Sequence, residues 1–157
     1  MLGVIILIFA LGIFLENKIR KYVSEKEVVL ENEMAVVKRV IDGDTIELND
    51  GRSLRYIGIN APEMTDKRPE VLCLAQLARA ENQRLVEGKT VELEKDINDK
   101  DKYDRLLRYV WINGEMVNIT LVKNGFASTA TYPPDIKYKD EILQAEKSST
   151  KVTCSKI

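Results

Sequence analysis

Two short segments carry acidic side chains whose types and spacing could do chemistry. The segment VIDGDTIEL places Asp42 and Asp44 on either side of a glycine. Neighbouring carboxylates repel each other, so the segment is either a solvated turn, in which Asp and Gly are common, or part of a cation site. The segment IGINAPE adds Asn60 and Glu63. Carboxylate, amide and backbone carbonyl oxygens are ligands that suit calcium, so both alternatives stay open.

Two arginines could supply the opposite charge. Arg55 lies two residues before Ile57 on the same face of a predicted strand, and Arg105 follows the charged run DKDKYD. A planar guanidinium binds phosphate oxygens through two parallel hydrogen bonds, which lysine does less well. The alternative for each is a surface arginine in a weak ion pair. If both arginines lie near the acids, the site suits a ligand that contains phosphate.

The composition excludes several kinds of catalytic site. The chain of 157 residues has no histidine, which excludes a Ser-His-Asp triad, a Cys-His pair and histidine-bound zinc. Its two cysteines cannot form a four-thiolate zinc site. Carboxylates, Tyr, Lys, Arg or a hard metal ion must therefore do any chemistry. The formal net charge is −1, so binding of nucleic acid would depend on a local cluster of basic side chains.

Turn signals and hydrophobic periodicity predict the elements that position these residues. We expect strands over residues 34–41, 45–48, 53–59, 90–95 and 106–112. We expect helices over residues 74–85, 117–123 and 132–147. This order favours an α+β, mainly β fold built on a closed five-stranded OB-fold barrel, with a split β-sandwich as the alternative. In a meander the second strand lies beside the third, so Asp44 can meet Asn60 and Glu63 at one rim.

The flanking segments differ from the predicted barrel in composition. Residues 2–15 carry no charge but are shorter than the roughly 20 residues that span a bilayer. We expect a hydrophobic helix over 1–15 that anchors the chain in a membrane, with a cleaved signal peptide or a buried core helix as alternatives. Residues 16–33 mix both charges and predict a solvated stalk. The domain then covers 34–147, and 148–157 form a tail.

The whole pattern resembles one known family. The segments VIDGDTIEL, LRYIGINAPE, DKYDRLLRYVW and GEMVNITLVKNGFA occur in this order and are similar to motifs of the thermonuclease, or staphylococcal nuclease, family. The resemblance covers residues 34–147. It implies an OB-fold barrel with three helices, working as a monomeric domain. It also implies hydrolysis of phosphodiester bonds in DNA and RNA with one calcium ion.

The resemblance assigns roles around that ion. Asp44 matches a calcium ligand, and Asn60 stands where the family has a second aspartate ligand. Ala61 stands where the family has a threonine that offers its backbone carbonyl to the ion. Asp42 matches a supporting acid that shapes the turn. Because Asn60 brings no negative charge, we expect weaker calcium binding than in relatives that keep the acid.

The resemblance also assigns roles toward the substrate. Glu63 matches the glutamate described as the general base for the attacking water. Arg55 and Arg105 match the phosphate-binding arginines. The positions near the bound nucleotide are Lys102 and Tyr103, and the candidates for stacking on the base are Tyr132 and, behind it, Tyr138. Either of these last two tyrosines could instead pack against the last helix.

Two further alternatives remain open. A non-catalytic OB-fold module that binds nucleic acid or protein competes with the nuclease, and Asn60 favours it, whereas the joint presence of the acids and arginines favours the enzyme. The basic residues that follow the apolar run at 18–21 would keep the domain in the cytoplasm, but the supply of external calcium favours an extracytoplasmic domain. In an oxidising compartment Cys73 and Cys154 could pair; otherwise they are two unrelated thiols.

Overall fold

A computed structural model describes residues 32–150 and 152–154. The expected membrane anchor, 1–15, lies outside these residues, as does nearly all of the expected stalk, 16–33. Within the part of the chain that is described, no helix is both long and apolar enough to cross a bilayer.

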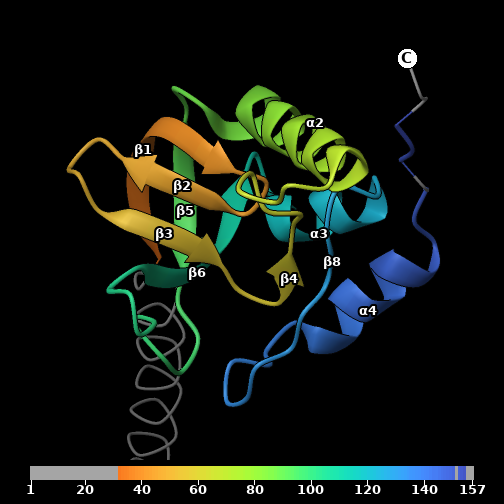
Figure 1. The fold of residues 1–157 in the computed structure, drawn as a ribbon. Coiled ribbons are helices and arrows are strands. Elements are labelled where there is room, and N and C mark those ends of the chain that lie inside the picture. The colour runs from red at the N-terminus through yellow and green to blue at the C-terminus, as the bar shows by residue number, and fades with distance from the viewer. Residues whose placement is uncertain (1–31, 151, 155–157) are drawn as a thin grey trace, which may run out of the picture. The chain divides into compact units, whose positions relative to one another are not determined.

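The strands close into a barrel, as expected for an OB-fold (Figure 1). The barrel strands are β1 (Glu33–Asp42), β2 (Thr45–Leu48), β3 (Ser53–Tyr56), β5 (Thr90–Glu94) and β6 (Leu106–Ile112). Neighbours pair antiparallel in the order β3-β2-β1-β5-β6, and a parallel pairing of β3 with β6 closes the ring. The alternative of a split sandwich is therefore excluded.

The long strand β1 belongs to both halves of the barrel. Its first residues, 33–36, pair with β5, and its later residues pair with β2. A register shift between Val37 and Arg39 lets Val37 and Val40 both point into the core, although they are three residues apart. Such an irregularity bends a strand and increases its twist, which is what a single strand needs to pass around a small barrel.

The expected strand over 53–59 is divided in two. Gly58 has a positive φ of 81° and separates β3 from the short β4 (Ile59–Asn60). A Cβ at this glycine would approach Ile142 Cδ1 to 2.6 Å, so both the backbone and the packing require glycine. β4 turns away from the barrel and pairs with β8 (Ser128–Thr129), a strand that the sequence did not predict.

Within the described residues the chain forms three helices around the barrel and beside one another (Figure 1). They are α2 (Pro69–Val86), α3 (Val117–Lys123) and α4 (Lys139–Lys147), and a short strand β7 (Glu115–Met116) precedes α3. α2 lies against β1, and α3 packs on both β6 and α4. α2 begins earlier than expected because Pro69 occupies its first turn, where a missing N–H costs nothing.

The prediction of a last helix that starts at Tyr132 is wrong. α4 begins only at Lys139, and residues 132–138 form turns with a cis peptide between Pro133 and Pro134. A residue that precedes proline is disfavoured in the helical conformation, so two successive prolines hold this segment out of a helix. The segment is thereby left as a loop beside the barrel.

Apolar side chains from the strands and the inner faces of α3 and α4 form one core. The fully buried barrel residues include Val37, Val40, Ile46, Leu48, Leu54, Tyr56, Leu93, Tyr109 and Val110. Burial of each large apolar side chain contributes about 1.5–3 kcal/mol relative to exposure. Trp111, on β6, is half-buried and packs against this core.

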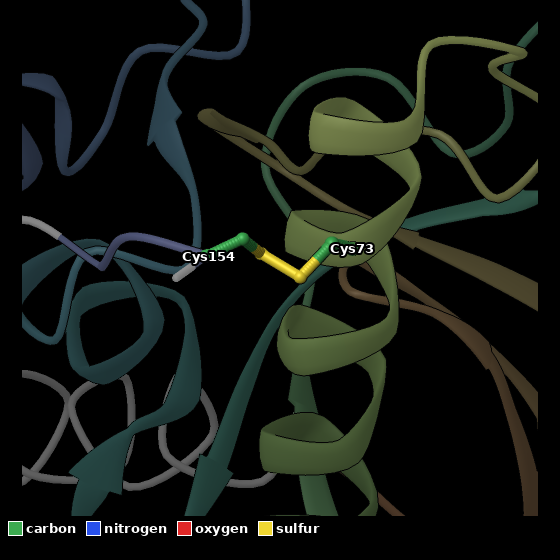
Figure 2. The surroundings of a disulfide bond; sticks show 2 residues. All are labelled: Cys73 and Cys154. Carbon is green, nitrogen blue, oxygen red and sulfur yellow. A yellow bond between two sulfur atoms is a disulfide. The ribbon is translucent and has the colours of Figure 1, made fainter. Parts of the chain in front are cut away.

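A disulfide bond joins Cys73 to Cys154, which settles the question of their pairing (Figure 2). Cys73 lies on α2, and Cys154 lies on the C-terminal segment, 81 residues further along the chain. The backbone N–H of Thr150 also donates to the carbonyl of Lys123 at the end of α3. The C-terminal segment is therefore attached to two helices.

Candidate active site

The pairing of β2 with β3 places an acid beside an arginine. Thr45 lies opposite Arg55 in this antiparallel pair, so the preceding Asp44 comes next to the Arg55 side chain. Asp44 is only 3% exposed, and its Oδ2 forms an ion pair with Arg55 Nη1. Arg55 Nη2 donates to the side-chain oxygen of Asn60 at 2.9 Å. One guanidinium thus holds two of the predicted metal ligands.

The Asp44 carboxylate is held from several sides. The backbone N–H of Ala61 donates to its Oδ2 at 2.5 Å, and the Thr45 hydroxyl donates to its Oδ1 at 3.1 Å. Asp42 Oδ1 accepts from the backbone N–H of Asp44 at 3.1 Å. Burial raises the pKa of Asp44, and the nearby Arg55 cation opposes that rise.

Helix α2 supports the turn that carries these acids. Gly43 fits between two small residues: a Cβ there would come within 2.5 Å of Ala61 Cβ and 2.8 Å of Ala78 Cβ. Asn82, fully buried on the same helix, donates to the carbonyl of Asp42 at 3.1 Å and accepts from the Tyr56 hydroxyl at 2.9 Å. The acidic turn, the segment that carries Ala61 and helix α2 are therefore packed as one unit.

A cleft of about 520 Å³ opens beside this unit. Its walls come from β3, the residues that follow β4, the loop between β5 and β6, and the proline loop before α4. Glu63 lies three residues after β4, directly after Pro62, and its side chain is exposed in the cleft. The residues predicted to act on a substrate all line it: Arg55, Glu63, Lys102, Tyr103, Arg105 and Tyr132.

Arg105 is fixed at the wall of the cleft by Asp101. Arg105 Nε and Nη2 each lie 2.7 Å from Asp101 Oδ2, and its backbone N–H donates to Asp101 Oδ1 at 3.1 Å. The loop turns through Asp104, which has a positive φ of 64°. Tyr103 is 68% exposed, and the charged ends of Lys102 and Arg105 lie 5.0 and 5.4 Å from its ring centre. A cationic, aromatic edge therefore faces the cleft.

The two C-terminal tyrosines have different environments. Tyr132 is 70% exposed and lines the cleft. Tyr138 is half-buried, and its ring meets those of Tyr109 and Trp111 edge to face, with centres 4.8 and 5.7 Å apart. Its hydroxyl donates to Glu94 Oε1 at 2.9 Å. Tyr132 is thus available to a ligand, whereas Tyr138 belongs to the packing between the barrel and α4.

The predicted metal ligands fit a hard cation in kind but are poor in charge. The oxygens of Asp44 and Asn60 converge on one positive group, the Arg55 guanidinium, and all donors in the set are oxygen, as calcium prefers. Across residues 32–150 and 152–154, no group of three or more Asp, Glu, His or Cys side chains gathers as a metal site. Asn60 provides oxygen without charge.

Several polar residues of the cleft were missed in the sequence, among them Asp135 and Asn98. Asp135 is buried, and its carboxylate accepts from the backbone N–H and the side-chain amide of Asn98, both at 2.8 Å. This pair ties the proline loop to the loop that carries Arg105. The only signal was Asp135 directly after two prolines, and a contact across 37 residues cannot be read from such a pattern.

Comparison with known proteins identifies the family of this chain. A family model described as staphylococcal nuclease homologue matches residues 53–154. A thermonuclease of Staphylococcus intermedius is 40% identical over 125 residues, which cover 78% of this chain and 74% of that protein. A thermonuclease of Staphylococcus hyicus is 40% identical over 119 residues, or 74% of this chain and 70% of that protein. Endonuclease YncB of Bacillus subtilis (strain 168) is 37% identical over 116 residues, or 71% and 55% of the two chains. The chain therefore belongs to the staphylococcal nuclease family.

Proposed function

We propose that this chain is a nuclease that hydrolyses phosphodiester bonds of DNA and RNA with the help of one calcium ion. The observation that carries the proposal is the meeting of Arg55, Glu63 and Arg105 in one cleft beside the buried Asp44. The thermonucleases and the endonuclease to which the chain is similar support this reaction. Because YncB is named an endonuclease, we extend the proposal to cleavage within a strand.

The arginines supply the electrostatic part of the mechanism. Negative charge on the phosphate oxygens grows as a fifth oxygen approaches phosphorus, and donors already aimed at that position stabilise it without reorganisation. Arg105 meets this condition because Asp101 fixes its guanidinium at the cleft wall. Arg55 also lines the cleft, and its guanidinium is bound to Asp44 and Asn60.

Glu63 supplies the base. The chain contains no histidine, and Glu63 is an exposed carboxylate within the cleft. It takes a proton from a water molecule as the water oxygen forms a bond to phosphorus. The opposite phosphorus–oxygen bond breaks, and the leaving oxygen takes a proton from a solvent water molecule. The protonated Glu63 then gives its proton to the hydroxide that remains. Lys102, Tyr103 and Tyr132 hold the nucleotide on either side of the reacting phosphate.

Calcium would be held by Asp44, the side-chain oxygen of Asn60 and the backbone carbonyl of Ala61. When bound, the ion supplies positive charge that offsets the charge growing on the phosphate. Asp42 keeps Asp44 in place through its backbone N–H. The low charge of this ligand set predicts weak binding of the ion in the absence of a nucleotide.

Cleavage assays with the full chain test the proposal. Labelled single-stranded DNA and RNA should be cut into shorter products when calcium is present. Excess chelator should stop the reaction, and added calcium should restore it. Binding of the same oligonucleotides without cleavage under any divalent ion would contradict the nuclease and support the non-catalytic module that Asn60 favours.

We further propose that the domain, with 34–147 as its bounds, works outside the cytoplasm and that residues 2–15 hold it at a membrane or direct its export. The disulfide between Cys73 and Cys154 supports this location, because such bonds persist in oxidising compartments. A reporter enzyme that is active on one side of the membrane only, fused after Ile157, tests it. Reporter activity confined to the cytoplasm would contradict the proposal.

A further inference from the structure

A second cavity, of about 410 Å³, lies next to the cleft. One wall is the turn between β2 and β3, residues 50–53, and the other is the loop before β6. Lys100, Tyr103 and Arg105 line both the cleft and this second cavity. These three residues, the shared ridge, therefore separate the two spaces, and a chain that leaves the cleft over them enters the second cavity.

The second cavity contains a fixed arginine. Arg52 donates from Nε to Asp50 Oδ2 at 2.8 Å, and its Nη1 and Nη2 bind the carboxylate of Glu33. Nη2 also donates to Asp50 Oδ2 at 2.5 Å. Within the described part of the chain these contacts use four of the five guanidinium hydrogens. The Arg52 guanidinium is thus held in one position, and one of its hydrogens remains for a further acceptor.

A lysine of the shared ridge can also turn to a new anion. Lys100 pairs with Asp104 at 2.8 Å, and the two side chains are 44% and 84% exposed. An exposed ion pair of this kind is worth only about 0–1 kcal/mol, so a phosphate can replace Asp104 at little cost. The charged residues of the lining are Arg52, Lys100 and Arg105 against Asp50 and Asp104, and Glu33, which is not part of the lining, also binds Arg52.

The proposed reaction gives this cavity a ligand. A phosphodiester inside a strand has a nucleotide on each side, so the strand must continue beyond the cleft. The shared ridge offers the exposed ring of Tyr103 on that route, and nucleic-acid bases stack on such rings whatever their sequence. Cations beyond the ring then meet the next phosphate.

We infer that the second cavity is an extension subsite of the nuclease, which binds the nucleotide next to the one in the cleft through contacts of Arg52 and Lys100 with its phosphate. The inference rests on the proposed nuclease function. It predicts that the preferred substrates are polynucleotide chains, because a substrate with a single phosphodiester leaves this subsite empty.

Steady-state kinetics of Arg52→Gln test the inference. The two substrates are a single-stranded oligonucleotide of about eight residues and the p-nitrophenyl ester of a nucleoside 5′-phosphate, which has one phosphodiester. We expect KM for the oligonucleotide to rise about five- to tenfold with little change in kcat, as loss of about 1 kcal/mol of uniform binding requires. Kinetics on the minimal ester should be unchanged. The slope of log KM for the oligonucleotide against log salt concentration should decrease by about one, as expected when one phosphate contact is lost.

Two control variants distinguish the loss of a phosphate contact at Arg52 from a general change in the charge of the protein. Arg84→Gln makes the same change of charge at an exposed ion pair on α2, away from both cavities, and should leave both substrates unaffected. Arg52→Lys keeps the charge and should retain most of the oligonucleotide affinity. Equal losses on both substrates in Arg52→Gln would mean that Arg52 only shapes the loop, and this would overturn the inference.

A length series with the unaltered chain gives an independent result. The value of kcat/KM should rise when one nucleotide is added to one side of a dinucleotide, and the gain should be absent in Arg52→Gln. No gain from a nucleotide on either side would overturn the extension subsite. Failure to hydrolyse even the minimal ester and the oligonucleotide would instead contradict the proposed function, so the two failures are distinct.

Discussion

Arg55 binds the same oxygens that calcium is proposed to use. Its guanidinium contacts the Asp44 carboxylate and the Asn60 amide oxygen, and only Asp44 brings a charge that balances it. At the scale of single residues, the choice of Asn at position 60 thus decides how strongly this pocket attracts a second positive group. The charge of the ligands is one of the factors that set calcium affinity.

Asn60→Asp should tighten calcium binding by roughly tenfold, equivalent to about 1.4 kcal/mol, because the substitution puts a carboxylate where the amide oxygen now accepts from the same guanidinium as Asp44. Calorimetric titration of the full chain with calcium measures the change. Asn49→Asp, which adds the same charge at an exposed turn, is the matched control and should have no effect. An unchanged or weaker affinity in Asn60→Asp would remove Asn60 from the metal shell.

Which residues meet at the site could be predicted from the sequence, but their contacts could not. The hairpin of β2 and β3 forces Asp44 and Arg55 together through its register, and register follows from short strands and tight turns. That Arg55 also binds Asn60 depends on the direction in which two side chains point at the surface of the site. The pair of Asp135 and Asn98 depends on how two distant loops pack.

At the scale of elements, the contact between α2 and the acidic turn transmits packing to the site. Gly43 leaves no room for a Cβ between Ala61 and Ala78. Its backbone is not in the left-handed region, so the constraint is one of space. A small residue at each contact lets the helix approach the turn closely.

Gly43→Ala should therefore destabilise the fold by about 1–3 kcal/mol, as overpacking of a close contact does, and should reduce cleavage because Ala61 moves. Chemical denaturation of the full chain gives the free energy of unfolding. In the double variant with Ala61→Gly, which removes the nearer clash, part of the loss should be recovered. Full stability in Gly43→Ala would show that the turn and the helix are not tightly packed.

The elements that were predicted correctly have a regular pattern. β2 and β6 follow hydrophobic strand signals over their whole length, and α3 has buried positions at helical spacing. β4 and β8 contain two residues each, too few for any periodicity, and they exist only because Gly58 redirects the chain. The start of α4 was misplaced because the charged residues after the prolines suit a helix that the prolines themselves prevent.

At the scale of the whole molecule, the disulfide closes most of the domain into one loop. It joins α2 to the C-terminal segment across 81 residues (Figure 2). A cross-link of this length restricts the unfolded chain and typically contributes about 2–4 kcal/mol. Composition predicted that pairing was possible but not that it occurs, because nothing in the sequence brings the tail to α2.

Replacing both Cys73 and Cys154 by Ser should lower the free energy of unfolding by about 2–4 kcal/mol and leave the cleft residues in place. Urea denaturation of the variant and of the original chain, each with and without a reductant, measures this. The reductant should bring the original chain to the stability of the variant and should not change the variant. Equal stability of the two chains without reductant would mean that the bond does not form.

The proposed hydrolysis depends on a carboxylate that activates water in the cleft. The most direct measurement is the single-turnover rate of oligonucleotide cleavage by Glu63→Gln with saturating calcium, together with the affinity of the oligonucleotide. Loss of a general base predicts a rate about 10²- to 10⁴-fold lower and an affinity within a few-fold of the original. Glu70→Gln, at an exposed position in the first turn of α2, should cleave at the original rate. Cleavage by Glu63→Gln at the original rate would contradict the account.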